Sequence, residues 1–411
     1  MKSKNTYHFI ENALSLFSVK AIDLILAILL IPYLILKVGI VNYGKYAFAL
    51  SLVLLLVNIT NYGFNLTAVR ELARYGKDTK KLNKLFNEVF SVKLYLTGFV
   101  LLLLLLLSIV VPSFAAYKLV YVFASFLIVG DLFSLRWFFM GLEKMKYIPA
   151  IHLGGTLMYV VLVLLFIKQP RDFEYIILLE GVGLFIVGVI SFLYIILEYN
   201  IKIQLLSFVK VKKYLYVNRG SFINLFIPSM LSNTAIFMVG LFSIPVNVSI
   251  IQLGVKVANA FATVNAVFTK VFYAMVNRKI QIMRQSFNVL LAIGVLLSLI
   301  MFFSADIVIK PWLNIKDVAV EQQISFIIKL LSPTPFLMAI ISAYGVNGLL
   351  VLKKDNLFSK ITIIATLVGM AVGLLVIPVY TFIGGAAFLI TTKALYALCS
   401  FLFFKKNIRV K

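Results

Sequence analysis

Long apolar stretches of about 20 residues or more recur along the whole chain, which is the length a helix needs to cross a bilayer. Each run is continuous, whereas the strands of a membrane barrel would alternate between apolar and polar residues over about ten positions. The pattern predicts an all-α polytopic membrane protein with twelve spans. The predicted spans are residues 14–36, 46–66, 93–112, 117–139, 147–168, 173–197, 222–243, 249–273, 287–309, 325–351, 358–379 and 382–404.

The longest polar connection divides these spans into two sets of six. It covers residues 198–221 and contains the basic run "KVKKYLYVNRG". After it, "SNTAIFMVGLFSIP" weakly echoes "SVKAIDLILAILLIP" near the N-terminus. We therefore predict a six-helix lobe over 1–197, a basic linker over 198–221 and a second six-helix lobe over 222–411. Six spans per lobe give both lobes the same orientation, as in parallel repeats.

Composition agrees with a membrane protein and explains most of its charge. The 411 residues are 62% hydrophobic and 13% charged, and the net charge is +24. Lysine and arginine gather in the loops on one side of the predicted topology, which places both termini in the cytoplasm. The basic excess is thus a topological signal, and a chain this apolar offers no soluble basic face to a nucleic acid.

Several lysines fall inside predicted spans, where a charge is costly. They are Lys20, Lys93, Lys256, Lys270, Lys329 and Lys393. For Lys93, for Lys270 and for Arg136, which lies close to the inner end of the span 117–139, the alternative is that the long side chain reaches the membrane surface. Lys393 lies at the middle of its span, about 15 Å from either surface, and shares a helical stripe with Tyr396. We expect it to face a central cavity, and the alternative is a buried structural ion pair.

The span 249–273 carries the longest polar stripe. Lys256, Asn259, Thr263 and Lys270 follow one another at steps of three, four and seven, so they share one face of a helix. Hydrogen bonding between helices would explain the asparagine and the threonine, but it leaves the lysines unexplained. The stripe therefore favours a polar, cationic lining.

Acidic residues lie well within the spans in the first half, whereas those of the second half lie at span ends or in loops. Asp23 lies three residues after Lys20 and can neutralise it, whereas Asp131 and Glu180 have no obvious partner in the sequence. A carboxylate within the membrane can take up a proton or a cation. We regard Asp23, Asp131 and Glu180 as candidates for ion coupling.

The sequence carries no pattern typical of an enzyme. It contains two histidines, one cysteine, no phosphate-binding glycine loop and no metal-ligand spacing. We expect no cofactor, no metal and no catalytic residue.

The basic stretch 70–88 is expected to lie at the inner membrane surface and to attract anionic lipid.

Two motifs resemble a known family. "YGKYAFALSLVLLLVNITNYGFNLTAVRELAR" (43–74) and "RWFFMGLEKMKYIPA" (136–150) are similar to segments of polysaccharide-export flippases of the Wzx type. These belong to the MOP superfamily (multidrug, oligosaccharidyl-lipid and polysaccharide exporters), which also contains multidrug extruders and the lipid II flippase. The first motif is the more specific, whereas the second has Met140 where glutamine is expected. The resemblance implies two six-helix bundles with the fold of these transporters.

The resemblance also implies a function. Such a protein would flip undecaprenyl-diphosphate-linked repeat units of O-antigen, capsule or exopolysaccharide across the bacterial inner membrane. It would work by alternating access, driven by an H⁺ or Na⁺ gradient, and could cooperate with a polysaccharide polymerase. The expected cationic cavity comprises Lys20, Lys256, Lys270, Lys329, Lys393, Arg136, Asn259, Thr263 and Tyr396.

Two other functions are compatible with the spans. A multidrug extruder would share the architecture, but a lysine-rich lining repels organic cations. A membrane polymerase or ligase acting on lipid-linked glycans would usually carry a large outer loop, and the outer connections here are short. Both are less favoured than a flippase.

Overall fold

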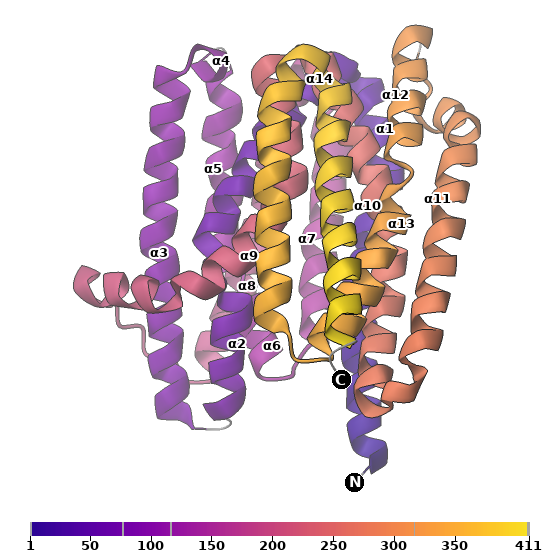
Figure 1. Cartoon of the computed structure of the whole chain (residues 1–411). Coiled ribbons are helices and arrows are strands. Elements are labelled where there is room, and N and C mark those ends of the chain that lie inside the picture. Colours follow the sequence, from indigo (N-terminus) through magenta and orange to yellow (C-terminus); the bar gives the residue numbers. More distant parts are fainter. Residues whose placement is uncertain (1, 76–77, 116, 316, 409–411) are drawn as a thin grey trace. The chain divides into compact units, whose positions relative to one another are not determined.

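The described part of the chain in this computed structural model is helical and contains no strand (Figure 1). The backbone is described for residues 2–75, 78–115, 117–315 and 317–408. Side chains are described from residue 29 onward, apart from 113, 274, 308, 310 and 408 within those ranges, and at 22, 25 and 26.

The helices follow one another with short connections. In the first half they are α1 (Lys2–Asn61), α2 (Phe64–Tyr75), α3 (Thr79–Val110), α4 (Pro112–Ala115), α5 (Lys118–Phe133), α6 (Arg136–Gly141), α7 (Tyr147–Phe166), the 3₁₀ turn η1 (Pro170–Asp172) and α8 (Phe173–Glu198). They continue with α9 (Phe208–Phe242), α10 (Pro245–Arg278), the 3₁₀ turn η2 (Ile280–Ile282), α11 (Met283–Leu313), α12 (Val318–Leu331), α13 (Thr334–Ile340), the π-helix η3 (Ile341–Leu350) and α14 (Asp355–Ile408).

Ten helices within the described residues are long and apolar enough to cross a membrane. Two of them are too long for one crossing, since α1 has 60 residues and α14 has 54, against about 20 for a single span. Each contains one break, at Gly39 (φ 81°) in α1 and at Thr381 (φ 49°) in α14. Figure 1 shows α14 folding back on itself as a hairpin. The ten helices are therefore consistent with twelve predicted crossings.

The chain forms two compact units. Unit 1 comprises Met1–Asn42 and Ala49–Met230, and unit 2 comprises Tyr43–Phe48 and Leu231–Lys411. The short piece 43–48 of α1 thus belongs to unit 2, and α9 passes from unit 1 into unit 2.

In unit 1, glycines bring helix backbones into direct contact. A Cβ atom at Gly181 of α8 would lie 2.6 Å from the Leu127 backbone nitrogen of α5, and one at Gly130 would lie 2.9 Å from the Phe185 nitrogen. Gly183 meets the Gly155 carbonyl of α7 in the same way, at 2.9 Å. Small residues allow this close approach, on which helix association in membranes depends. We call these contacts of Gly130, Gly181 and Gly183 the glycine seam.

One end of unit 1 has an aromatic core rather than a glycine seam. Phe64 and Leu72 of α2, Phe86 of α3 and Phe138 of α6 are all buried in it. The pair of edge-on rings Phe86 and Phe138, with centroids 6.0 Å apart, is typical of favourable aromatic packing.

At the start of α3, Asp78 caps the helix by accepting from the Lys81 amide, and this hydrogen bond lowers the pKa of Asp78.

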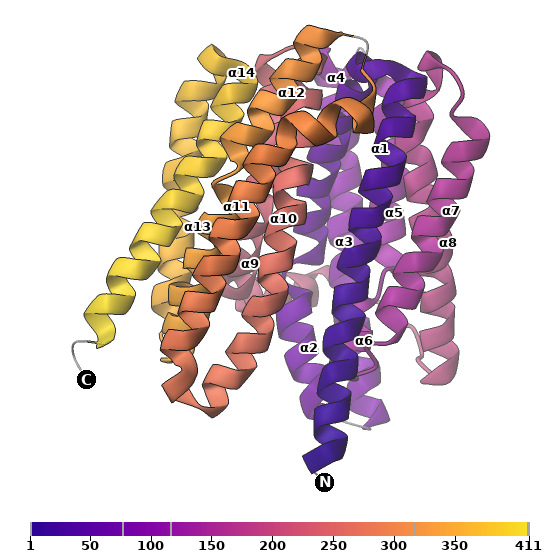
Figure 2. The same cartoon turned by 90° about the vertical axis from the view of Figure 1, so that its right-hand side faces the viewer.

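Unit 2 packs α10, α11, α12, α13, η3 and α14 against one another. Figure 2 shows α10 and α11 side by side. A Cβ atom at Gly294 of α11 would lie 2.4 Å from the Cβ of Ala339 in α13. A buried aromatic cluster including Phe287 and Phe404 joins α11 to the C-terminal part of α14.

Replacing Gly181 by leucine should destabilise the protein. The added side chain would collide with the α5 backbone, which cannot move aside, and overpacking of this kind costs about 1–3 kcal/mol. We expect Gly181→Leu to unfold at lower temperature than the unmodified protein in the same detergent. Gly98→Leu is the matched control, since no atom lies within 4 Å of a Cβ there. Equal losses in both variants would contradict the assignment of the seam.

Candidate functional site

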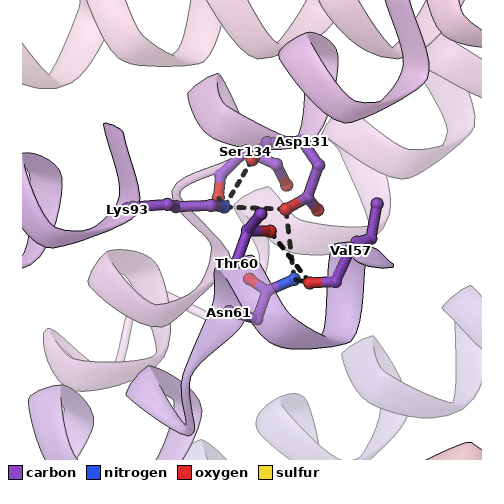
Figure 3. A network of polar contacts seen from close by, with 6 residues as sticks. All are labelled: Val57, Thr60, Asn61, Lys93, Asp131 and Ser134. Atoms are coloured by element: carbon purple, nitrogen blue, oxygen red, sulfur yellow. Dashed lines mark hydrogen bonds and ion pairs between the residues drawn. The ribbon is translucent and has the colours of Figure 1, made fainter. Parts of the chain in front are cut away.

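A buried ion pair lies at the meeting point of α1, α3 and α5 in unit 1 (Figure 3). The ammonium nitrogen of Lys93 lies 2.9 Å from Oδ2 of Asp131. It also donates to the Asp131 and Ser134 carbonyl oxygens at the end of α5. The Asn61 amide donates to the same carboxylate oxygen at 3.1 Å. The carboxylate thus receives one charged and one neutral donor.

The position of Lys93 differs from the surface-directed side chain that we expected from the sequence. Only 1% of the residue is exposed, so its ammonium group does not reach the membrane surface. The reason is that Asp131 and two carbonyl groups solvate it locally. Asp131, a candidate for ion coupling, therefore has a partner that was not evident in the sequence.

The polar stripe of α10 lies in unit 2 and is only partly covered. Asn259 and Lys270 are exposed, and Lys256 and Thr263 are half-buried. Thr263 donates to the Asn259 carbonyl at 2.8 Å. Within the part of the chain that the structure describes, neither lysine has an ion-pair or hydrogen-bond partner.

A buried asparagine on α10, Asn265, makes a hydrogen bond to a neighbouring helix. Asn265 is fully buried, and its amide donates to the Pro335 carbonyl of α13 at 3.4 Å. Thr269 donates to the Asn265 carbonyl at 2.8 Å. Because Asn265 makes the polar contact with the neighbouring helix, that contact does not involve the stripe of Lys256, Asn259, Thr263 and Lys270.

Lys393 lies in the C-terminal part of α14 and is 8% exposed. The preceding Thr392 fits against Gly369, where a Cβ would lie 1.7 Å from the threonine oxygen, so the two arms of α14 are packed tightly beside Lys393. Tyr396 is half-buried and contacts the Phe358 ring at a centroid distance of 5.5 Å. Among the described residues, no carboxylate or other acceptor pairs with the Lys393 ammonium group.

Lys256 and Lys393 lie at similar depth in unit 2. Helix α10, which carries Lys256, meets the C-terminal arm of α14, which carries Lys393, where a Cβ at Gly385 would lie 3.3 Å from Ile251. From this contact both helices run in the same direction (Figure 2). Lys256 follows this contact by five residues and Lys393 by eight, which correspond to about 7.5 and 12 Å along the helices.

Lys329 does not join this group. It pairs with Asp306 of α11, whose other oxygen accepts from Ser325. The neighbouring Ile327 and Leu331 lie beside Gly254 of α10, and Lys329 is about 200° around the helix from each of them. Its charge is thus neutralised and directed away from α10, contrary to the cavity position expected from the sequence.

The other predicted residues lie in different surroundings. Arg136 is exposed at the start of α6, with Nη2 3.4 Å from Nδ1 of His152. Glu180 is half-buried on α8 beside the glycine seam. Lys20 and Asp23 lie among the residues whose side chains are not described.

Comparison with known proteins places the chain in a family. A family model described as "Polysaccharide biosynthesis protein" matches residues 9–273, more than half of the chain. The chain belongs to this family. A protein of Escherichia coli named "Putative O-antigen transporter" is 26% identical over 409 residues, which is 97% of each chain. A protein of the same name from Shigella dysenteriae is 31% identical over 183 residues, covering 44% of this chain and 45% of the relative.

Solved structures of membrane transporters share the fold of this chain. The lipid II flippase MurJ in an inward closed conformation has a TM-score of 0.74 at 13% identity, over 96% of this chain and 87% of that one. A eukaryotic MATE transporter has a TM-score of 0.61 at 12% identity, over 99% and 97%. These findings confirm the predicted family and the predicted helical transporter fold.

The Lys93 and Asp131 pair should behave as a structural unit. Asp131→Leu would leave a buried ammonium group without its counter-ion, and removing one partner of a buried pair costs about 3–5 kcal/mol. The double variant Lys93→Met/Asp131→Leu should recover most of that loss, because no uncompensated charge remains. Thermal unfolding of the purified variants measures both effects.

The exposed pair of Lys329 and Asp306 provides the control. Their side chains are 32% and 62% exposed, so Asp306→Leu should cost about 1 kcal/mol or less. A larger loss in Asp306→Leu than in Asp131→Leu, or a double variant no more stable than Asp131→Leu, would contradict the buried-pair assignment.

Proposed function

We propose that this protein flips lipid-linked oligosaccharide repeat units from the inner to the outer leaflet of the bacterial cytoplasmic membrane. The units would be linked through a diphosphate to an undecaprenyl chain and used for O-antigen, capsule or exopolysaccharide. Membership in the polysaccharide biosynthesis family supports this proposal, as does the likeness to proteins named as O-antigen transporters. The fold shared with a lipid II flippase also supports it.

The observation that carries the proposal is a difference between two kinds of lysine. Lys93 and Lys329 are neutralised by aspartates, whereas Lys256, Lys270 and Lys393 in unit 2 have no acidic partner among the described residues. An ammonium group within the membrane is costly unless it has an anionic partner. A diphosphate supplies such a partner, with several oxygens that accept charge-assisted hydrogen bonds.

Neutral polar groups beside these lysines suit the sugar part of the substrate. Asn259 and Thr263 lie between Lys256 and Lys270 on the same stripe of α10, and the phenol of Tyr396 follows Lys393 by one helical turn. Amide and hydroxyl groups can donate to and accept from glycan hydroxyls. The inside-negative membrane potential would favour outward movement of the anion, by about 2.3 kcal/mol per charge per 100 mV.

Transport would proceed by alternating access and be coupled to an H⁺ or Na⁺ gradient. Asp131 is a candidate for the coupling group, because protonation of its carboxylate would weaken the attraction that holds Lys93. We further propose that both termini lie in the cytoplasm, and that the flipped unit is passed to a polysaccharide polymerase. The unpaired lysines weigh against a multidrug extruder of the same fold, since they would repel organic cations.

Removing the unpaired charges should strongly reduce export. We expect Lys256→Gln and Lys393→Gln each to reduce export at least about tenfold, because a hydrogen bond to a charged group contributes about 1.5–3 kcal/mol. The measurement is surface polysaccharide in a bacterium that depends on this protein, together with the lipid-linked unit that accumulates inside.

Two further lysine variants test whether the effect is specific. Lys329→Gln should have a smaller effect, since Asp306 already neutralises that charge. Lys360→Gln, near the exposed start of α14, is the control for a general loss of positive charge. Normal export in both the Lys256 and Lys393 variants, with protein present in the membrane, would contradict the proposal that these lysines bind the diphosphate.

The coupling role of Asp131 can be separated from its structural role. The charge-neutral double variant Lys93→Met/Asp131→Leu should keep the fold, and it has no titratable group at either position. If Asp131 couples transport, flipping by this variant in vesicles should no longer respond to an imposed ion gradient. An unchanged response would remove Asp131 from the mechanism while leaving substrate binding untouched.

A further inference from the structure

The segment before α9 is held against α3 by a ladder of side chains within unit 1. Asn83, Asn87 and Ser91 follow one another every four residues along one face of α3. Their side-chain oxygens accept from the backbone amides of Lys202 at 3.1 Å, Gln204 at 2.8 Å and Leu206 at 3.0 Å. Every second amide from Lys202 to Leu206 is thereby satisfied without a partner strand.

This ladder leaves a pocket of about 1180 Å³ between the segment and the first turns of α3. Four lysines line it, namely Lys80, Lys84, Lys202 and Lys210, together with the acids Glu88 and Glu198. Lys84 and Lys210 both lie close enough to Glu88 to attract its carboxylate, and a further acid, Glu71, also lies near it. The positive charges outnumber the negative ones, so the pocket favours an anion.

An apolar surface begins directly beside the pocket. α9 starts at Phe208 and runs across α3 (Figure 1), with the Phe208 ring 5.9 Å from that of Tyr95. Val211, on the inner face of this first part of α9, is buried, whereas Phe208 and Val209 are 64% and 77% exposed. A helix start with exposed apolar residues and lysines is typical of a segment lying at a membrane surface.

The exposed face of α3 connects the pocket to this apolar surface. Tyr95, Phe99, Leu102 and Leu106 are all exposed, and they follow Lys84 at spacings of eleven, four, three and four residues. At about 100° per residue these positions form one stripe. A molecule with an anionic group at Lys84 could therefore lay an apolar chain along α3.

We propose that this pocket binds the headgroup of an anionic phospholipid of the inner leaflet. Lys84 and Lys210 would contact the phosphate, and the acyl chains would lie along the α3 stripe and the exposed start of α9. The adjoining apolar stripe favours a lipid over a free anion, because only a lipid has acyl chains that can pack on it. This site lies within unit 1 and is independent of the lysines assigned to the transported substrate.

The test is lipid binding by the purified full chain. Native mass spectrometry during titration with phosphatidylglycerol measures the dissociation constant of the first lipid bound. Each lysine near an anionic lipid contributes about a fivefold change in affinity, so Lys84→Gln/Lys210→Gln should weaken binding about 25-fold. Lys84→Gln alone should weaken it about fivefold. Phosphatidylethanolamine, which has no net charge, should bind less tightly to the unmodified protein.

The matched control removes two lysines from another basic surface. Lys353→Gln/Lys354→Gln, in the turn between η3 and α14, should leave the first phosphatidylglycerol site unchanged. An equal loss in this control, or unchanged binding in the Lys84 and Lys210 variant, would overturn the proposal. Inorganic phosphate competing as strongly as phosphatidylglycerol would identify a general anion site and would also overturn it. Export measurements do not enter this test, so it can fail while the proposed function stands.

Discussion

The absence of water in the hydrocarbon layer is the constraint on which the other features of this structure depend. A charged side chain there needs an opposite charge, a set of hydrogen-bond partners or a polar ligand. Lys93 meets this need with Asp131 and two carbonyl groups. The lysines on α10 and α14 without such partners are therefore the ones for which a ligand has to be considered.

The same constraint shapes the backbone. Helices satisfy their own amides, and glycine seams such as that of Gly181 and Gly130 let them approach closely in the membrane. The extended segment before α9 cannot satisfy its amides by itself. Asn83, Asn87 and Ser91 do so instead, and in this way the ladder fixes where α9 begins.

A shared fold does not define a substrate. A lipid II flippase and a multidrug resistance transporter both have this architecture, and function has to be argued from the chemistry of particular residues. Here the family is one of polysaccharide biosynthesis, and the unpaired charges of unit 2 are positive. Both observations support the proposal of an anionic, sugar-bearing lipid over an organic cation.

The sequence by itself determined the helical membrane fold, the family and the polar stripe of α10, because all three rest on local periodicity or on continuous motifs. It could not determine which charges pair. Lys93 and Asp131 are 38 residues apart, and Asp306 and Lys329 are 23 apart, so only the packing of different helices brings each pair together. An isolated aspartate within a span signalled a missing partner but not its identity. The tertiary structure alone decided that Lys93 and Lys329 are neutralised while Lys256 and Lys393 are not, since the free energy of a membrane charge depends on its neighbours in space.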